Sequence, residues 1–232
     1  MYPQDHNNEE LGRIEKALLE VANNVGISET KTFNKYSNVC GLEAQSIEEV
    51  WLQDLECARK ISEDWKKWAK IQAGSSGVGF GMTGLVGLIP DITVLMAINL
   101  RMIQAIALTY GFSFTSEQEK IELWFVIGSC LGVSQYRDIV GKSASKSWDK
   151  YIQGTPCNDR PLSLVLRKIA KALSIKLTKK SVVKTVPLLA SPVGGAMNYS
   201  MTESVGVKAI DYFEEKKKYC IHKKFNPFQS SI

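Results

Sequence analysis

Two charged residues lie inside the longest apolar stretch of this chain, which spans residues 79–112 and reads GFGMTGLVGLIPDITVLMAINLRMIQAIALTYGF. Asp91 follows Pro90, where a carboxylate can cap a helix by accepting the free backbone N–H groups of its first turn. Arg101 lies ten residues further on, about 15 Å along a helix, so the two side chains cannot pair within that helix. We therefore expect Asp91 to cap the helix and Arg101 to form a buried ion pair with an acid elsewhere.

A ligand site is the alternative role for these two charges. Asp91 and Arg101 could converge with Asn198 in a polar cavity, as in an enzyme that acts on a lipid or a small molecule. Asn198 belongs to a row of small and polar residues spaced by four, which one face of a helix would carry. The row consists of Gly194, Asn198, Thr202 and Gly206. We expect this row to contact another helix, with a ligand-facing row as the alternative.

The residue patterns that common catalytic and metal sites require are missing from the sequence. The two histidines, His6 and His222, lie near the ends of the chain and outside any zinc-binding or acyl-transfer pattern. The segment DIVGKS ends like a phosphate-binding loop, but Tyr136 stands where that loop requires its first glycine. The sequence therefore predicts no catalytic residue, no metal and no cofactor.

The cysteines and the N-terminus indicate a cytoplasmic protein. The five cysteines are odd in number and widely spaced, without a C-x-x-C pair, which is typical of free thiols in a reducing compartment. They are Cys40, Cys57, Cys130, Cys157 and Cys220. The first ten residues, MYPQDHNNEE, contain neither the basic nor the apolar region of a secretory signal.

The positive charge is concentrated in the C-terminal two-thirds of the chain. Residues 1–70 carry thirteen acids and nine bases, whereas residues 71–232 supply the rest of a net charge of +5, which is +9. Residues 160–202 contain eight Lys or Arg and no acid. A polyanion is the matching partner class, and because no nucleic-acid-binding motif accompanies the basic run, we expect anionic lipid and no nucleic acid.

One helix within this basic region combines an apolar face with many cations. Leu162, Val165, Leu166, Ile169 and Leu173 share one helical face. That helix could lie on an anionic membrane with its lysine stems along the surface, or it could pack on the core with solvated lysines. Both interpretations stay open, and the candidate surface consists of Arg167, Lys168, Lys171, Lys176, Lys179, Lys180 and Lys184.

Helical periodicity without any alternating strand pattern predicts a single all-α domain of six to eight helices. Helices are expected over residues 8–26, 46–72, 116–134, 162–173 and 194–219, and the second and third begin with capping boxes, Ser46 with Glu49 and Ser116 with Glu119. Trp51, Trp65 and Trp68 should share the apolar face of the second helix. We divide the chain into an N-terminal helix with a polar connection (1–45), a helical domain (46–219) and a disordered tail (220–232).

The glycine-rich stretch has the length of a membrane span but not the composition. Residues 71–90 contain no charge and could cross a bilayer. Their glycines, Pro90 and the two charges that follow oppose insertion. We expect a buried helical hairpin over residues 77–111, in which glycines allow another helix to approach closely, with membrane insertion as the alternative.

The segments GLIPDITVLMAINLRMIQAIALTYGF and KSVVKTVPLLASPVGGAMNYSMTESVGVKAIDYF together resemble the bacterial EcsC protein family over roughly residues 50–215. The matching positions are Pro90, Asp91, Arg101, Tyr110, Gly111, Pro187, Gly194, Gly195 and Asn198. The family's founding member is encoded beside an ATP-binding cassette transporter, and the family offers no catalytic residues to carry over. Taken together with the basic charge of the C-terminal region, the resemblance leads us to expect a helical accessory protein, peripheral at the inner face of the membrane, with anionic lipid or a membrane protein as partner.

Overall fold

The computed structural model describes residues 3–80, 88–155, 160–181 and 190–228. Within these ranges the chain forms ten helices and no strand, which confirms the all-α prediction and exceeds the expected number of helices. The helices are α1 (Pro3–Asn24), α2 (Glu29–Cys40), α3 (Ile47–Leu52), α4 (Leu55–Phe80), α5 (Leu88–Thr109), α6 (Glu117–Cys130), α7 (Ser134–Val140), α8 (Ala144–Ile152), α9 (Leu162–Ser181) and α10 (Ala190–His222).

Polar caps fix the starts of several helices. At α6 the capping box is complete, since Ser116 Oγ accepts from the Glu119 N–H at 3.2 Å and Glu119 Oε2 accepts from the Ser116 N–H at 2.8 Å. The helix expected over 46–72 is instead divided into α3 and α4. Asp54 causes this division, because its Oδ1 accepts from the Cys57 N–H at 2.7 Å and so starts a new helix.

The segment expected to be a polar connection contains α2. This helix ends at Gly41, which has a φ of 66° and donates its N–H to the Ser37 carbonyl at 3.0 Å. Phe33 and Tyr36 are its buried aromatic side chains, about one turn apart, and Thr32 is buried beside them. Helix α2 was not predicted because these two aromatic residues, among mostly polar neighbours, give only a weak helical periodicity.

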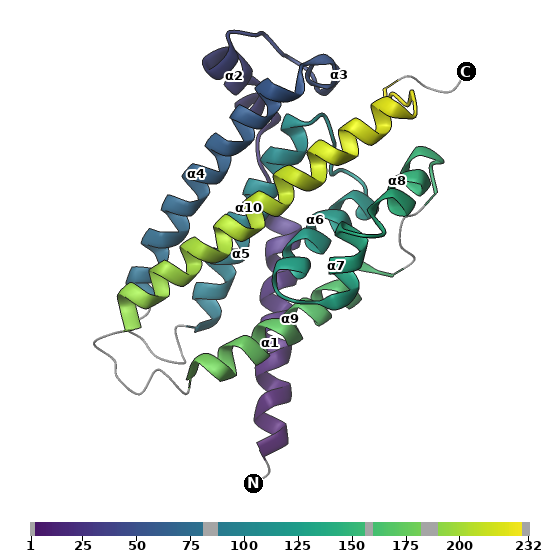
Figure 1. Ribbon diagram of the computed structural model, residues 1–232. Helices are drawn as coiled ribbons and strands as arrows, with labels where there is room; N and C mark the ends of the chain where they lie inside the picture. Colours follow the sequence, from purple (N-terminus) through teal and green to yellow (C-terminus); the bar gives the residue numbers. More distant parts are fainter. Residues whose placement is uncertain (1–2, 81–87, 156–159, 182–189, 229–232) are drawn as a thin grey trace.

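The long helix α10 packs across the pair formed by α4 and α5 (Figure 1). Helices α1 and α9 lie on one side of this pair, while α6, α7 and α8 cover another. Helices α4 and α5 contact each other, but α4 begins well before the hairpin expected over residues 77–111, and residues 81–87, which join the two helices and contain several of its glycines, lie outside the described residues. The last helix packs on both helices, as the sequence predicts.

Helix α5 is the apolar centre of the bundle. Among the described residues, only its stretch Ile89–Thr109 is long and apolar enough to cross a membrane, with a mean hydropathy of 1.7, and 72% of that window is buried inside the fold. Its neighbours are other helices of the same chain: α1, α2, α3, α4, α6 and α10. The apolar side chains of α5 thus form core contacts, which agrees with the buried hairpin.

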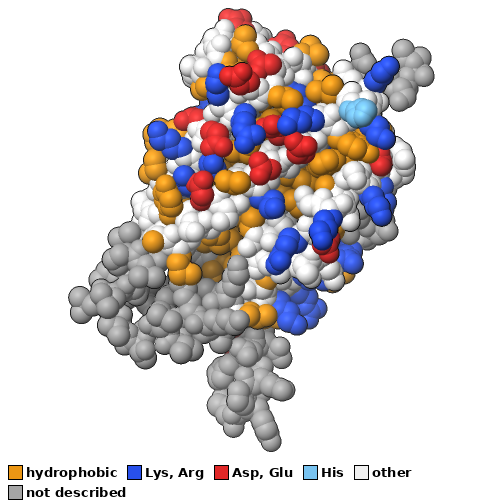
Figure 2. Space-filling view, viewed as in Figure 1, with side chains coloured by type: hydrophobic (Ala, Val, Ile, Leu, Met, Phe, Trp, Pro, Cys, Tyr) orange, Lys and Arg blue, Asp and Glu red, His pale blue; other side chains and the backbone are white. Residues whose placement is uncertain are grey.

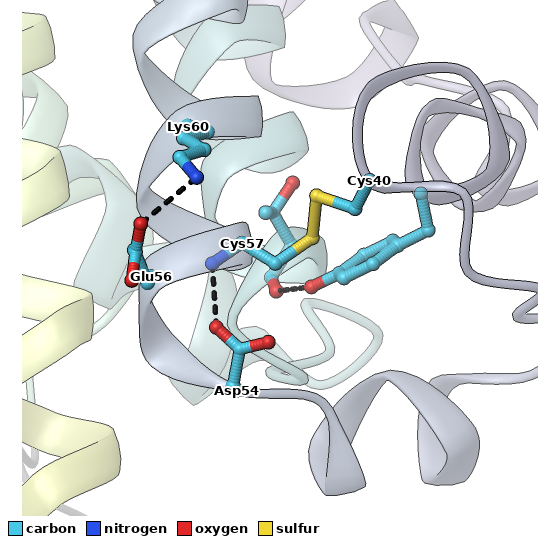
Figure 3. Close-up of a disulfide and its surroundings, with 7 residues drawn as sticks. Cys40, Asp54, Glu56, Cys57 and Lys60 are labelled. Atoms are coloured by element: carbon cyan, nitrogen blue, oxygen red, sulfur yellow. Dashed lines mark hydrogen bonds and ion pairs between the residues drawn. A yellow bond between two sulfur atoms is a disulfide. The ribbon is translucent and has the colours of Figure 1, made fainter.

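A disulfide joins α2 to the start of α4 and corrects the prediction of free thiols at two positions. Cys40 and Cys57 are bonded with their Cα atoms 6.1 Å apart (Figure 3). Cys130 and Cys220 are thiols, and Cys157 lies outside the described residues. The seventeen-residue separation of the bonded pair matches no spacing rule, so only the approach of α2 to α4 brings these cysteines together.

Candidate functional site

Asp91 and Asn198 pair across the interface of α5 and α10. The Asn198 side-chain amide donates to Asp91 Oδ1 at 3.3 Å, and Asn198 is buried. Asp91 is not the cap that the sequence predicts, because α5 begins at Leu88 and places Asp91 within its first turn. A carboxylate there still complements the positive end of the helix.

The small and polar row of α10 faces the core, as expected. Asn198, Thr202 and Gly206 are buried, and a Cβ added at Gly206 would meet Lys66 Cγ of α4 at 2.5 Å. The glycine therefore allows the aliphatic stem of Lys66 to cross α10. Gly195 is buried as well, whereas the surroundings of Gly194 and the whole of Pro187 are outside the described residues.

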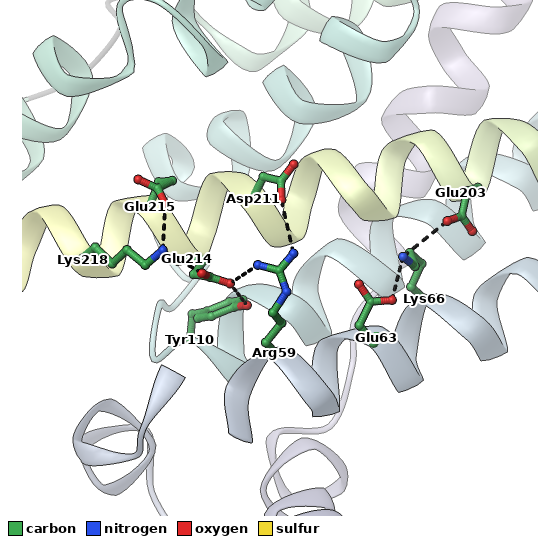
Figure 4. Close-up of polar contacts among 9 residues, drawn as sticks. All are labelled: Arg59, Glu63, Lys66, Tyr110, Glu203, Asp211, Glu214, Glu215 and Lys218. Carbon is green, nitrogen blue, oxygen red and sulfur yellow. Dashed lines mark hydrogen bonds and ion pairs between the residues drawn. The ribbon is translucent and has the colours of Figure 1, made fainter. Parts of the chain in front are cut away.

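Tyr110, at the end of the α5 segment, is linked to a charged cluster between α4 and α10 (Figure 4). Its buried hydroxyl donates to Glu214 Oε2 at 3.2 Å. The same carboxylate binds Arg59 of α4 at 2.8 Å and Lys218 of α10 at 2.8 Å. Arg59 also approaches Asp211 at 3.9 Å. Tyr110 belongs to the family motif but its partner Glu214 does not, so the motif alone could not predict this contact.

The protonation states of this cluster follow from burial and its cations. Burial acts to raise the pKa of Glu214, but hydrogen bonds and charges from Lys218 and Arg59 outweigh it and lower the pKa below its ordinary value. Burial, and next the Glu214 charge, raise the pKa of Tyr110 well above its ordinary value. Tyr110 therefore stays neutral and acts as a hydrogen-bond donor that fixes α10 against α5.

A second set of ion pairs continues the α4 to α10 contact. Lys66 binds Glu63 at 2.7 Å and Glu203 at 3.3 Å (Figure 4). Lys70 also binds Glu203. Because Lys66 is nearly buried, its charge needs these two carboxylates. The cations of α4 that face α10 are thus satisfied within the chain.

Gly111 has a steric role. Its φ is +83°, and a Cβ added there would meet both the Cα and the ring of Trp51 at 3.1 Å. The backbone turn after α5 can therefore pass Trp51 only with glycine at this position. Tyr110 and Gly111 are adjacent in the motif and contact different neighbours of α5. Tyr110 binds Glu214 of α10, and Gly111 lies against Trp51 of α3.

Arg101 does not form the buried ion pair that the sequence predicts. Its side chain is exposed, and within the described ranges it takes part in no ion pair. It lines a cavity of about 420 Å³ formed by the α1–α2 connection and by α2, α4 and α5, which we call the Arg101 cavity. Trp68, expected on the buried face of α4, is 54% exposed and lines the same cavity.

The three polar residues proposed for a catalytic cavity are divided between two places. Asp91 binds Asn198, whereas neither of them lines the Arg101 cavity. Pro90 is exposed and lines a different cavity against α1, again without Asp91 or Asn198. The arrangement offers one structural contact, Asp91 with Asn198, and one cation-lined cavity in place of one convergent polar site.

The apolar face of α9 is used inside the fold. Val165, Leu166, Ile169 and Leu173 are buried in the core, where α9 contacts α1 and α6. This face therefore cannot lie on a membrane. The side chains of Lys176, Lys179 and Lys180, and all of Lys184, are outside the described residues.

The opposite face of α9 is exposed and mixes aliphatic with basic side chains. We call it the α9 surface, and it comprises the exposed residues Leu164, Arg167, Lys171 and Ile175 together with half-buried Lys168. Arg167 lies 3.3 Å from Glu15 of α1, and Lys168 donates to Gln135 of α7. In Figure 2 acidic and basic side chains are mixed over α2, α4 and α10, whereas the side of α7 and α9 shows mainly basic ones.

Two lysines near the C-terminus, Lys216 and Lys217, are buried although no local sequence pattern predicts it. Lys216 is 1% exposed, binds Glu122 of α6 at 2.7 Å and lies over the Tyr151 ring at 4.0 Å. Lys217 is also 1% exposed and donates to the Gln53 carbonyl at 3.0 Å, just after α3. Burial lowers the pKa of Lys217 to about 8, partly offset by Asp54. The run EEKKK looks like solvated surface, and no local signal identifies its buried members.

Titratable groups do not gather into a metal site in the described part of the chain, where no three or more His, Cys, Asp or Glu could hold an ion together. The ionic side chains serve instead as links between α10 and its neighbours α4, α5 and α6. Fold and contacts thus define a class of protein: an all-α bundle organised around an apolar hairpin and a long helix fixed to it by polar pairs.

The chain belongs to the EcsC protein family, which it matches over residues 1–215. This match confirms the resemblance and begins earlier than the segments that carry it, so α1 and α2 lie within the family region. No curated protein and no solved structure matches the chain significantly.

Proposed function

We propose that this EcsC protein is an accessory module that associates peripherally with anionic membranes through the α9 surface. This proposal rests mainly on the composition of that exposed face. Leu164 and Ile175, 47% and 49% exposed, stand at its two ends with three cations between them. The whole of α9 contains no acid. Aliphatic side chains that can enter the lipid boundary, combined with basic ones, are typical of interfacial helices.

The expected binding is weak and electrostatic. Each basic side chain near an anionic surface contributes about 1 kcal/mol, and salt reduces this contribution over a Debye length. Arg167 contributes less than the others because Glu15 partly neutralises it. Lys171 is exposed and has no such partner among the described residues. A cytoplasmic location at the inner face of the membrane follows from this proposal, and a membrane protein with an acidic surface is the other partner class.

Liposome co-sedimentation tests the proposal. The protein should bind vesicles that contain phosphatidylglycerol, should not bind pure phosphatidylcholine vesicles, and should be released as salt rises. Lys168→Gln with Lys171→Gln should weaken binding at least tenfold at low salt. Ile175→Ser should weaken it further by removing an aliphatic contact.

Matched controls exist elsewhere on the chain. Lys67→Gln removes one exposed cation from α4, and Leu52→Ser removes a 77% exposed aliphatic side chain from α3. Neither change should affect vesicle binding. Equal binding to both vesicle types, or equal losses in the control variants, would contradict a role for the α9 surface.

A further inference from the structure

The Arg101 cavity has the dimensions and lining of a small-molecule site. Its volume of about 420 Å³ falls within the range of about 300–1,000 Å³ found for such sites. Four segments of the chain form its walls: the α1–α2 connection, α2, α4 and α5. Ligand pockets between helices of a bundle are commonly built from several elements in this way.

Two cations and no acid line this cavity. Arg101 comes from α5 and Lys31 from α2, and neither takes part in an ion pair among the described residues. Asp64, next to Trp65 in sequence, is already bound to Lys35. At the α4 to α10 contact, by contrast, each cation is paired with a carboxylate. These cations are Arg59, Lys66 and Lys70. Arg101 and Lys31 thus line one partly open cavity without a carboxylate partner among the described residues.

The rest of the lining is largely apolar. Trp65, Trp68, Ile98 and Met102 contribute to it. Packing in the core holds Trp65, and the ammonium group of Lys35 lies 4.4 Å from the centre of its ring. Trp68, by contrast, has 54% of its surface exposed, which a ligand with an apolar body would cover. The cavity lining therefore combines two cations with two tryptophan side chains.

We propose that the Arg101 cavity binds an anionic amphiphile, namely a phosphate or carboxylate group joined to a short apolar chain or ring. The guanidinium of Arg101 accommodates either anion through paired hydrogen bonds, and Lys31 adds a second positive charge. The apolar part lies against Trp68 and Met102. This site is separate from the α9 surface and does not depend on membrane association.

Hexyl phosphate is a suitable probe because it is soluble and needs no vesicle. Isothermal titration calorimetry on the full chain should detect its binding, while inorganic phosphate, which lacks the apolar part, and hexanol, which lacks the anion, should bind at least tenfold more weakly. Heptanoate distinguishes a carboxylate from a phosphate ligand. If inorganic phosphate binds as well as hexyl phosphate, the site is a plain phosphate site and the proposal is overturned.

Substitutions connect binding to the cavity. Arg101→Gln should weaken hexyl phosphate binding at least tenfold and Lys31→Gln severalfold, whereas Lys67→Gln, the same charge change outside the cavity, should leave it unaltered. Hexyl phosphate should shift the tryptophan emission to shorter wavelength, and Trp68→Phe should abolish most of this shift. Unchanged circular dichroism shows that the variants fold. No binding of hexyl phosphate or heptanoate to the wild-type chain, or equal binding to Arg101→Gln, would overturn the proposal, whatever the vesicle experiments give.

Discussion

The hydroxyl of Tyr110 donates a hydrogen bond to Oε2 of Glu214 at 3.2 Å, and this contact joins the end of the apolar hairpin to the last helix of the chain. The two residues are 104 positions apart. Arg59 binds the same Oε2 from α4, so one carboxylate connects α4, α5 and α10. This connection makes the cluster a direct target for measurement.

Tyr110→Phe should lower the free energy of unfolding by about 1 kcal/mol, the usual loss for one buried hydrogen bond. In a Glu214→Ala background the same change should cost clearly less, because the acceptor is already absent. A double-mutant cycle by urea denaturation measures this coupling. Additive losses would show that the hydroxyl and the carboxylate do not interact in solution.

Gly111→Ala should lower the free energy of unfolding by about 2–3 kcal/mol, from its positive φ together with overlap against Trp51. Gly41→Ala is the matched control, since Gly41 has a φ of +66° but nothing within 4 Å of an added Cβ. It should cost only about 1 kcal/mol. Equal losses at the two sites would mean that Trp51 moves aside without penalty.

Reduction of the Cys40–Cys57 disulfide should destabilise the fold by about 3 kcal/mol, the loop-closure value for a separation of this size. Denaturation with and without dithiothreitol provides the measurement. The double variant Cys40→Ala with Cys57→Ala should resemble the reduced protein and should not respond to dithiothreitol. A wild-type protein that is equally stable under both conditions would contradict a structural role for the bond.

Lys217 should make stability increase with pH. Its pKa is about 8 in the fold against an ordinary value of 10.5, so between these values the unfolded chain binds more protons and rising pH favours folding. We expect a gain of about 1 kcal/mol from pH 7.5 to 9. Above that range Cys220 opposes the trend, because burial raises the pKa of its thiol to about 11.

Lys217→Met is the variant that tests this assignment. It removes the titrating group while keeping an unbranched side chain, so its stability should be nearly constant from pH 7.5 to 9. Urea denaturation at four pH values gives the slope for both proteins. A wild-type slope that persists in Lys217→Met would assign the effect to another group.

Local sequence patterns were enough to predict the helical class, the apolar helix α5 and the family. Each of these depends on local information: apolar residues recur at helical spacing, and the Ser116–Glu119 capping box closes within one turn. The division at Asp54 had a local signal too, an N-cap residue inside an apparently continuous pattern. Helical periodicity also revealed the apolar face of α9. It did not show whether that face would contact the core or a membrane.

Only the tertiary structure decided which polar residues have partners. Local spacing cannot tell that Arg59 has Glu214 while Arg101 has no ionic partner in the described chain. It cannot tell that Lys217 is buried or that Cys40 meets Cys57. The physical reason is the distance along the chain over which each effect acts. Helical periodicity relates residues about four positions apart. The energy of a charge or of an exposed tryptophan depends instead on the distant segment that packs beside it. The Arg101 cavity likewise forms where four segments of the chain meet. Two cations line it, Arg101 and Lys31, and neither has an ionic partner among the described residues.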